Sequence, residues 1–486
     1  MATDSNRFQA IISHCKEYGF IFPSSEIYDG LGAVYDYGQW GSELKKNIKD
    51  HWWKSMTQMY ENIVGIDAAI FMHPTTWKAS GHVDNFSDPM IDNKDSKKRY
   101  RVDHLIEAKA DELEKQGHGD QAEILLKQMD ELLANNDFDG LKTLIENKIV
   151  CAVSGTGNWT DVRQFNLMFS TEFGAVSSED EENIVYLRPE TAQGIFVNFL
   201  NVQKTGRMKI PFGIAQIGKA FRNEIVARQF IFRMREFEQM EMQFFIRPGT
   251  QKEWYEYWKA ERMKWHLGLG IGPDKYRFHD HVKLAHYADA ACDIEYNFPI
   301  GFKEVEGIHS RTDFDLRNHQ EYSKKKMQYF DNDLDPATGK PFGNYIPYVI
   351  ETSIGVDRTV MMVLSEAYEE QDLSTEEKKD SRVVLRLPAK LAPIKLAILP
   401  LVKKDGLPEI ARDIMNKCKE HFRCFYEEKD TIGKRYRRMD ALGTPFCVTI
   451  DHQSKEDNTV TIRYRDSMQQ ERISIDTIKA KVLSAF

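Results

Sequence analysis

The segment AFRNE at residues 220–224, followed by FRMREFEQMEMQFF at 232–245, predicts two neighbouring strands of a sheet. Acidic and basic side chains alternate with apolar ones along both strands. Charged groups on an inward strand face are costly unless they are paired or hold a ligand. The spacing therefore leaves two interpretations open, an ion-pair ladder across a hairpin or a ligand site. The charged residues concerned are Arg222, Glu224, Arg228, Arg233 and Arg235.

A second segment of this kind is ETSIGVDRTVMMVL at residues 351–364. It predicts a strand that turns at Gly355 and enters a helix with Arg358 in its first turn. Glycine lets the backbone approach a ligand closely, and a guanidinium there can hold phosphate oxygens with two hydrogen bonds. The alternative interpretation is that Arg358 is a solvated charge on the helix surface.

Two shorter segments carry further candidate residues. In YLRPETAQG at 186–194, Glu190 lies in the first turn of a predicted helix, where a helix cap is the simplest interpretation. WKASGHVDNF at 77–86 is a turn of small residues that carries His82. A single histidine in such a turn is more often a loop residue than a catalyst, so neither segment assigns a function by itself.

The pattern along the chain predicts an α+β fold in four regions. Residues 1–94 mix glycine, aromatic and apolar segments, and residues 95–150 are charged and helical in period, which predicts a helical insertion. Residues 151–382 contain many strands with helices between them, which favours an antiparallel or mixed sheet. Residues 390–486 alternate strands and helices, as is typical of a small α/β domain.

Composition excludes several classes of protein. The 486 residues are 41% hydrophobic and 29% charged, which excludes disorder and collagen-like repeats. No apolar run is long enough to span a membrane, and the N-terminus lacks the features of a secretion signal. Six scattered cysteines without a CxxC pair indicate a reduced, cytoplasmic protein. With 66 basic and 75 acidic residues, the net charge of −9 argues against DNA and non-specific nucleic-acid binding.

Taken together, these segments resemble the class II aminoacyl-tRNA synthetases and, within them, the homodimeric glycyl-tRNA synthetases. AFRNE…FRMREF resembles class motif 2, IGVDR resembles motif 3, and the helix and strand that end at Pro74 resemble motif 1. WKASGH, RPETAQG, RQFNLMF, FEQMEMQFF and ETSIG are similar to glycine-specific signatures. IGKRYRRMDALGTPFCVTID at 432–451 resembles the anticodon-binding domain. The resemblance covers essentially the whole chain.

The resemblance implies a two-step reaction in which glycine and ATP form glycyl-adenylate, and the glycyl group is then transferred to tRNA. Arg222 would hold the α-phosphate and the glycine carboxylate, and Arg358 the γ-phosphate end of ATP; these two are the expected catalytic residues. Phe237 would stack on the adenine ring, and Glu304 would bind Mg²⁺. The expected ATP-binding residues are Arg222, Asn223, Glu224, Phe232, Arg233, Arg235, Phe237, Glu304, Val305, Gly355 and Arg358.

By the same resemblance, a pocket of carboxylates would recognise the glycine ammonium group. The expected glycine-binding residues are Arg101, Glu190, Glu238, Glu241, Glu351 and Ser353. Basic residues beside an aromatic one suit single-stranded bases, so tRNA is expected to contact Lys434, Arg435, Tyr436 and Arg437, although a solvated helix face is the alternative. The resemblance also implies a homodimer, because motif 1 builds the subunit interface in this family; Trp52 and Trp53 on its helix would form an unusual exposed patch on a monomer.

One departure from the family pattern concerns zinc. Relatives often carry two cysteine pairs in the insertion, whereas here only Cys151 is kept, with Asn93, Ser96 and Ser154 at the other positions. A zinc site needs four soft or imidazole ligands, so we expect none. Two alternative functions are considered. One is a non-catalytic nucleic-acid-binding relative, such as the accessory subunit of mitochondrial DNA polymerase, and the other is a class II enzyme for proline, threonine or serine.

Overall fold

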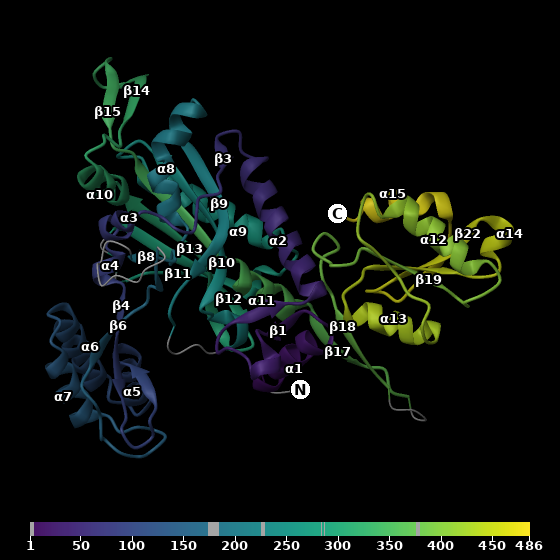
Figure 1. The fold of residues 1–486 in the computed structure, drawn as a ribbon, viewed down its shortest axis with the longest axis horizontal. Helices are drawn as coiled ribbons and strands as arrows, with labels where there is room; N and C mark the ends of the chain where they lie inside the picture. The colour runs from purple at the N-terminus through teal and green to yellow at the C-terminus, as the bar shows by residue number, and fades with distance from the viewer. Residues whose placement is uncertain (1–3, 174–183, 225–228, 283, 286, 376–379) are drawn as a thin grey trace.

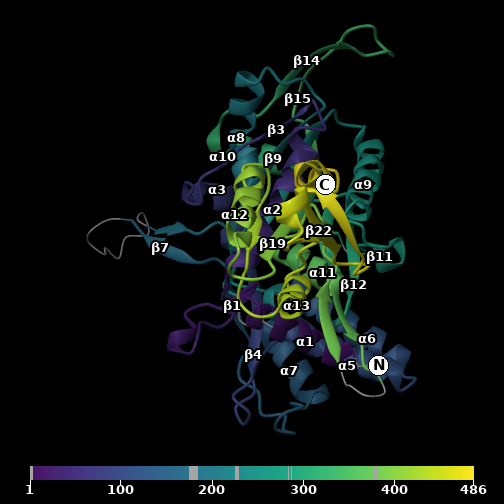
Figure 2. The same ribbon diagram turned by 90° about the vertical axis from the view of Figure 1, so that its right-hand side faces the viewer.

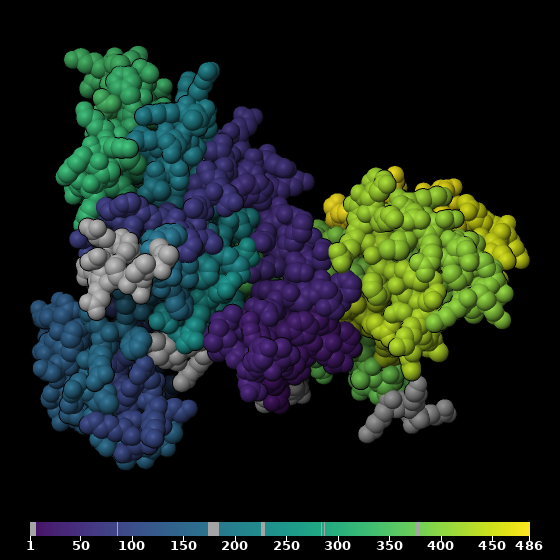
Figure 3. All heavy atoms as spheres, viewed as in Figure 1, coloured from purple at the N-terminus to yellow at the C-terminus, as the bar shows by residue number. Residues whose placement is uncertain are grey.

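The computed structural model describes residues 4–173, 184–224, 229–282, 284–285, 287–375 and 380–486. Arg228, a candidate residue of the motif 2 segment, lies outside these ranges. Figure 1 shows three parts: a central sheet with its helices, a small helical unit at one end, and a C-terminal lobe at the other. The space-filling view in Figure 3 shows the same C-terminal lobe beside the N-terminal segment.

The centre of the molecule is a seven-stranded sheet in which all neighbours are antiparallel except β3, which runs parallel to β9. The order across the sheet is β11 (Tyr276–Asp280), β12 (Ala290–Phe298), β13 (Gly301–Thr312), β16 (Tyr348–Gly355), β10 (Glu236–Ile246), β9 (Phe212–Phe221) and β3 (Ile63–Gly65). The long antiparallel pairing of β9 with β10 is the predicted motif 2 hairpin. The expected α+β class with an antiparallel sheet is confirmed.

Helices cover both faces of this sheet, because successive side chains of a strand point to opposite faces. Phe244 of β10 packs in one core with helices on its side, whereas its neighbour Phe245 packs in a second core. The first core involves α1 (Asp4–Glu17), α2 (Gln39–Thr57), α9 (Gln251–Leu267) and α11 (Val356–Ala367). The second involves α8 (Ala192–Thr205) and α10 (Phe314–Ser323).

Short helices and hairpins complete this part of the chain. The helices are α3 (Pro74–Ala79) and α4 (His82–Asn85). The hairpins are β1 (Ile21–Pro23) with β2 (Tyr35–Tyr37), β7 (Ser170–Glu172) with β8 (Ile184–Tyr186), β14 (Tyr329–Leu334) with β15 (Pro341–Tyr345), and β17 (Tyr368–Asp372) with β18 (Ser381–Leu385). Figure 2 shows that β7 and the β14–β15 hairpin project away from the body of the molecule.

The helical unit has a sheet and a hydrophobic core of its own. Its strands are β4 (Ser87–Asp92), β5 (Arg99–Arg101) and β6 (Arg163–Asn166), and its helices are α5 (Val102–Lys115), α6 (Gly119–Ala134) and α7 (Phe138–Lys148). The buried residues of this core all come from the segment 91–162. The helices expected in residues 95–150 are therefore present, and they pack together with strands that the sequence pattern did not predict.

The C-terminal lobe is a five-stranded sheet with helices, ordered β20-β19-β21-β22-β23. Its elements are β19 (Leu396–Pro400), α12 (Leu407–Cys418), β20 (Cys424–Tyr426), α13 (Ile432–Ala441), β21 (Phe446–Ile450), α14 (Ser454–Asp457), β22 (Thr459–Tyr464), β23 (Gln470–Ser474) and α15 (Ile478–Leu483). The first three strands in the order are parallel and the last three are antiparallel. The predicted alternation of strands and helices in this lobe is confirmed.

The expectation of an exposed tryptophan pair on α2 is wrong. Trp52 is 0% exposed and packs in the core beneath the sheet. Trp53 is half-buried against Gly65, where a Cβ atom would lie 2.1 Å from the indole ring. The polar residues on either side of the pair suggested a surface. In an amphipathic helix, however, a buried position recurs every three or four residues, so polar neighbours do not exclude burial of Trp52. These side chains therefore give no argument for a dimer.

Candidate active site

A cavity of about 240 Å³ opens over the sheet and gathers charged side chains from β10, β13, β16 and α11, and from the segment that follows β9. Residues from the predicted motif 2 and motif 3 segments meet here because β10 pairs with β9 on one side and β16 on the other. Its lining includes Glu190, Arg222, Glu224, Phe232, Arg233, Phe237, Glu238, Gln239, Glu241, Tyr287, Glu304, His309, Arg311, Glu351, Ser353, Gly355, Asp357 and Arg358.

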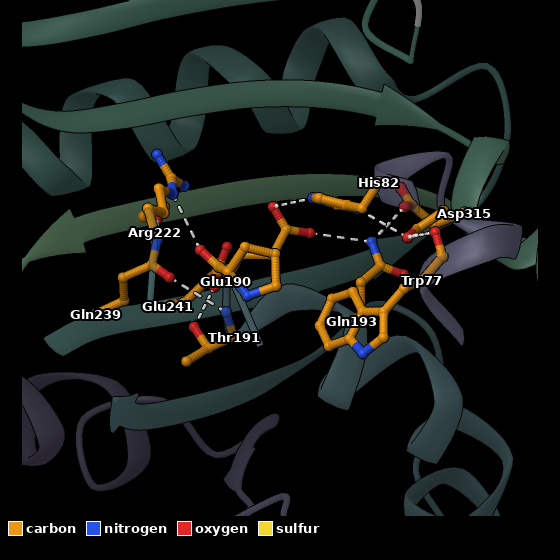
Figure 4. A network of polar contacts seen from close by, with 12 residues as sticks. Trp77, His82, Glu190, Thr191, Gln193, Arg222, Gln239, Glu241 and Asp315 are labelled. Atoms are coloured by element: carbon orange, nitrogen blue, oxygen red, sulfur yellow. Dashed lines mark hydrogen bonds and ion pairs between the residues drawn. The ribbon is translucent and has the colours of Figure 1, made fainter. Parts of the chain in front are cut away.

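Three carboxylates, Glu190, Glu241 and Glu351, line the cavity from three separate segments. Gln243 donates from Nε2 to Glu351 Oε2 at 2.6 Å and to Glu241 Oε1 at 3.3 Å, so one amide bridges two of the acids. The Thr191 hydroxyl donates to Glu241 Oε2. Figure 4 shows the Glu190 side of this network, where the acid lies between His82 and Gln193.

The three acids differ in protonation because their neighbours differ. Burial raises the pKa of Glu190, but His82 and Arg311 outweigh burial and hold the pKa at about 2. Glu351 has a pKa far below its ordinary value, since Arg311 and His309 overcome its burial. Burial, together with the charges of the other two acids, raises the pKa of Glu241 well above its ordinary value. Part of the mutual repulsion is therefore relieved by keeping Glu241 neutral.

A buried network from β13 and the nearby helices supports the acids. Arg311 donates from Nη1 to Glu351 at 2.9 Å and from Nε and Nη2 to Asp315 at 2.9 and 3.1 Å. His309 Nδ1 lies 2.7 Å from Glu351 Oε1, and this contact raises the pKa of His309 although burial opposes it. Gln193 donates to Asp315 at 2.9 Å, which extends the network to α8.

Four further residues line the cavity although the sequence pattern did not point to them: Gln239, Tyr287, His309 and Arg311. His309 and Arg311 occupy alternate positions along β13, and this period-2 spacing of polar residues could have indicated that both side chains face the site. Gln239 lies one strand alternation from Glu241 and donates to the Ser353 hydroxyl at 3.3 Å. Tyr287 has no comparable pattern around it.

The opposite end of the cavity is basic and aromatic. Arg222 donates from Nε to the Pro189 carbonyl at 3.1 Å, and its guanidinium carbon lies 5.3 Å from the Phe237 ring centroid. Arg358 lies 4.4 Å over the Phe232 ring, and its Nη1 lies 2.9 Å from Glu304 Oε2. Arg358 is the main reason why the pKa of Glu304 is lowered, so this carboxylate is held ionised.

Several predicted site residues lie away from the cavity lining. Val305 is 1% exposed in the core, and Arg235 donates to the Glu224 and Gly32 carbonyls at 3.0 and 3.3 Å. Arg101 pairs with Asp88 at 3.2 Å and with Asp103. The backbone amide of Asn223 donates to the Leu167 carbonyl at 2.8 Å.

Glu238 touches the cavity, but its carboxylate is used elsewhere. It lies 2.9 Å from Lys45 Nζ and 2.8 Å from Lys49 Nζ, both on α2. Because residues 238 and 241 differ by an odd number along β10, their side chains leave opposite faces of the sheet. The structure therefore separates the Glu238 carboxylate from the three acids with which the resemblance grouped it.

The basic stretch of α13 is largely structural. Arg435 is 1% exposed and donates to the Pro400 and Glu427 carbonyls at 2.7 and 3.0 Å. The Tyr436 hydroxyl bonds to Thr449, and Arg437 pairs with Asp380 at 2.7 Å. Lys434 is exposed. The structure therefore contradicts Arg435 as a surface contact for tRNA, since its guanidinium satisfies backbone carbonyls inside the lobe.

The four positions that the sequence comparison related to zinc ligands, Asn93, Ser96, Cys151 and Ser154, come together in space. The Cys151 thiol lies 3.4 Å from the Ser96 hydroxyl and 3.2 Å from the Tyr100 hydroxyl. Ser154 donates to Asn93 Oδ1 at 2.9 Å. In the described ranges, no group of three or more histidine, cysteine or acidic side chains is arranged to hold a metal ion.

Sequence models of three known regions match the chain. The tRNA synthetase class II core domain (G, H, P, S and T) matches residues 169–367, and the anticodon binding domain matches residues 395–485. The glycyl-tRNA synthetase insertion domain 1 matches residues 88–123 and 118–167. Across the described part of the chain, every helix is either too short or too polar to cross a membrane.

Whole proteins resemble the chain over nearly its full length. A glycine–tRNA ligase of Chlorobaculum tepidum is 53% identical and covers 96% of this chain and 97% of its own length. Those of Treponema denticola and Borreliella burgdorferi are 52% and 51% identical, over 96% and 98% of this chain and 94% and 98% of their own lengths. A structure titled as the RNA binding domain of threonyl-tRNA synthetase from Cryptosporidium parvum has a similar fold, with a TM-score of 0.62 at 15% identity and 97% coverage of both chains.

Proposed function

The chain belongs to the glycine–tRNA ligase family of class II tRNA synthetases, and from this premise we propose how its cavity binds the substrates and carries out the reaction. The protein attaches glycine to tRNA at the expense of ATP. The observation that carries the assignment of the site is the division of one cavity into an acidic end and a basic, aromatic end. An amino acid needs an acid for its ammonium group, and ATP needs cations for its phosphates.

At the acidic end, Glu190 and Glu351 are ionised and bind the glycine ammonium group, while neutral Glu241 donates or accepts a hydrogen bond. Ser353 lines the same end, where its hydroxyl is oriented by Gln239. Arg311 and His309 hold Glu351 in place, so they are positioning residues. Any side chain larger than that of glycine would have to displace this hydrogen-bonded network, which excludes larger amino acids.

At the basic end, Arg222 binds the glycine carboxylate and the α-phosphate. The carboxylate oxygen attacks the α-phosphorus, the bond to pyrophosphate breaks, and glycyl-adenylate forms. Arg222 is already oriented by Pro189, Phe86 and Phe237, so little reorganisation is needed when charge develops at phosphorus. No nucleophile from the protein is required, because the attacking group belongs to glycine.

The rest of ATP is held by Phe237, Arg358 and Glu304. Phe237 stacks on the adenine, and Arg358 covers the nucleotide and binds its terminal phosphate. The Glu304 carboxylate is ionised and half-exposed at the cavity, which fits a Mg²⁺ ion that also takes phosphate oxygens. Bound Mg²⁺ would neutralise phosphate charge. Arg358 then exchanges its contact with Glu304 for a contact with the nucleotide.

The second step transfers the glycyl group to the terminal ribose of tRNA. The match of residues 395–485 to the anticodon binding domain supports the C-terminal lobe as the tRNA-binding part. Lys434 is the member of the basic α13 stretch that is exposed for such contact. The insertion, expected at 95–150, is assigned to residues 87–166, because its strands and core lie in that range. The catalytic domain, expected at 1–94 and 151–382, is then residues 1–86 and 167–382, and residues 390–486 are assigned to the anticodon-binding domain. We also propose a homodimer, on the basis of the resemblance, and a cytoplasmic location, on the basis of the cysteine pattern.

Pyrophosphate exchange into ATP, measured with each amino acid in turn, tests the function. We expect exchange with glycine, at a rate at least about a hundredfold above that with alanine. Exchange with proline, threonine or serine instead would assign the chain to another specificity, and no exchange with any amino acid would support a non-catalytic relative. Sedimentation at micromolar concentration tests the homodimer, which an active monomer would contradict.

A further inference from the structure

A buried ion cluster lies beneath the strand that carries the cavity residues. Lys45 of α2 is 7% exposed, and its Nζ lies 2.8 Å from Asp357 Oδ1 and 2.9 Å from Glu238 Oε2. The Tyr37 hydroxyl donates to the same Asp357 oxygen at 2.6 Å, and its ring centroid lies 4.2 Å from the Lys45 Nζ. Side chains of four elements, β2, α2, β10 and α11, therefore meet around one buried lysine.

The cluster connects the two elements that carry the proposed nucleotide residues. Asp357 Oδ2 accepts a hydrogen bond from the Glu238 backbone amide at 2.9 Å, which ties α11 directly to β10. Glu238 lies between Phe237 and Gln239, and Asp357 precedes Arg358. Any shift of this tie would therefore change the position of Phe237 relative to Arg358.

Lys45 is the member of the cluster that contacts both acids. Lys49 contacts Glu238 at 2.8 Å, but its side chain is 28% exposed. Burial raises the pKa of Glu238, and the two lysines overcome burial and lower it, so the acid is ionised. Without Lys45, the donors to Asp357 among the described residues would be neutral ones, the Tyr37 hydroxyl and a backbone amide. A buried carboxylate without a cationic partner would draw in water or move toward another cation.

We infer that Lys45 is a positioning residue for ATP. It holds β10 against α11 and thereby sets the separation between Phe237 and Arg358, between which the adenine is bound. The glycine end depends less on this tie, because Glu351 and Glu241 are fixed by Arg311, His309, Gln243 and Thr191. The inference rests on the proposed function, which places the nucleotide at this end of the cavity.

Lys45→Met removes the charge while keeping the length of the side chain. In glycine-dependent pyrophosphate exchange, normalised to active sites counted from trapped adenylate, we expect the KM for ATP to rise at least about tenfold, since small displacements of binding groups are costly. The KM for glycine should change by less than about threefold. Lys46→Met is the matched control, because Lys46 is exposed on the same helix and pairs with Asp50; it should leave both values unchanged.

Lys45→Arg should restore much of the affinity for ATP, since a guanidinium can contact both acids. Equal changes in both KM values, or fewer active sites with a normal KM for ATP, would show a purely structural role and overturn the inference. If Lys45→Met does not fold, Tyr37→Phe weakens the same tie, and an unchanged KM for ATP in that variant would also overturn it. Absence of glycine-dependent exchange in the wild-type protein would instead refute the proposed function.

Discussion

Replacing Arg222 by alanine tests the proposed chemistry most directly. The guanidinium is oriented by the Pro189 carbonyl at 3.1 Å and by the rings of Phe86 and Phe237, at 5.5 and 5.3 Å from its carbon. Among the described residues, no acceptor takes a hydrogen bond from its terminal nitrogens, so both are available to substrate. Two charge-assisted hydrogen bonds, each worth about 1.5–3 kcal/mol, would be lost in the transition state.

Allowing for incomplete loss, Arg222→Ala should raise the barrier to adenylate formation by about 3–4 kcal/mol, which is a factor of roughly 10²–10³ in rate. Arg222→Lys keeps the charge but not the planar fork, so its loss should be intermediate. Pyrophosphate exchange measures the rate, and tRNA affinity should barely change. Arg317→Ala is the control, because Arg317 is an exposed residue of α10 that pairs with Asp313, the residue before this helix. A rate for Arg222→Ala within about tenfold of wild type would refute the assignment.

Three further outcomes are expected. Ser353→Gly should weaken glycine binding and relax the rejection of alanine. If the variant still discriminates fully against alanine in exchange assays, Ser353 does not bind glycine. Burial lowers the pKa of His14 from 6.5 to about 4. The contribution of this group to folding stability is therefore fully present above pH 6.5, and up to about 3 kcal/mol should be lost as the pH is lowered toward 4. Denaturant unfolding of His14→Gln should show a shallower dependence, and an identical one would contradict the assignment. A zinc-selective chelator should leave folding and charging unchanged; stoichiometric zinc lost together with activity would disprove this.

The sequence predicted the elements whose patterns are local. The β9–β10 hairpin, the strand and helix around Gly355, and the alternating elements of the C-terminal lobe follow from apolar periodicity and turn residues. The convergence of Glu190, Glu241 and Glu351 needed the resemblance as well, because strand register decides which residues face one another.

What failed depended on neighbours distant in the sequence. Trp52 lies among polar residues and Arg435 among basic ones, which suggested a surface and a nucleic-acid contact, yet both side chains are buried by packing that the local pattern does not encode. The resemblance grouped Glu238 with Glu241, although their side chains leave opposite faces of β10. The network around Arg311 was missed because its partners, Asp315 and Glu351, come from different elements.

The separate core of the insertion bears on how such an enzyme can change during evolution. Buried residues of this unit contact one another within the segment 91–162, so a substitution there is felt mainly inside the unit. Ser96, Asn93 and Cys151 are likewise joined by hydrogen bonds inside this unit. Residues can therefore be replaced, added or lost in this unit with little effect on the geometry of the reaction cavity, so the insertion can diverge between lineages faster than the site does.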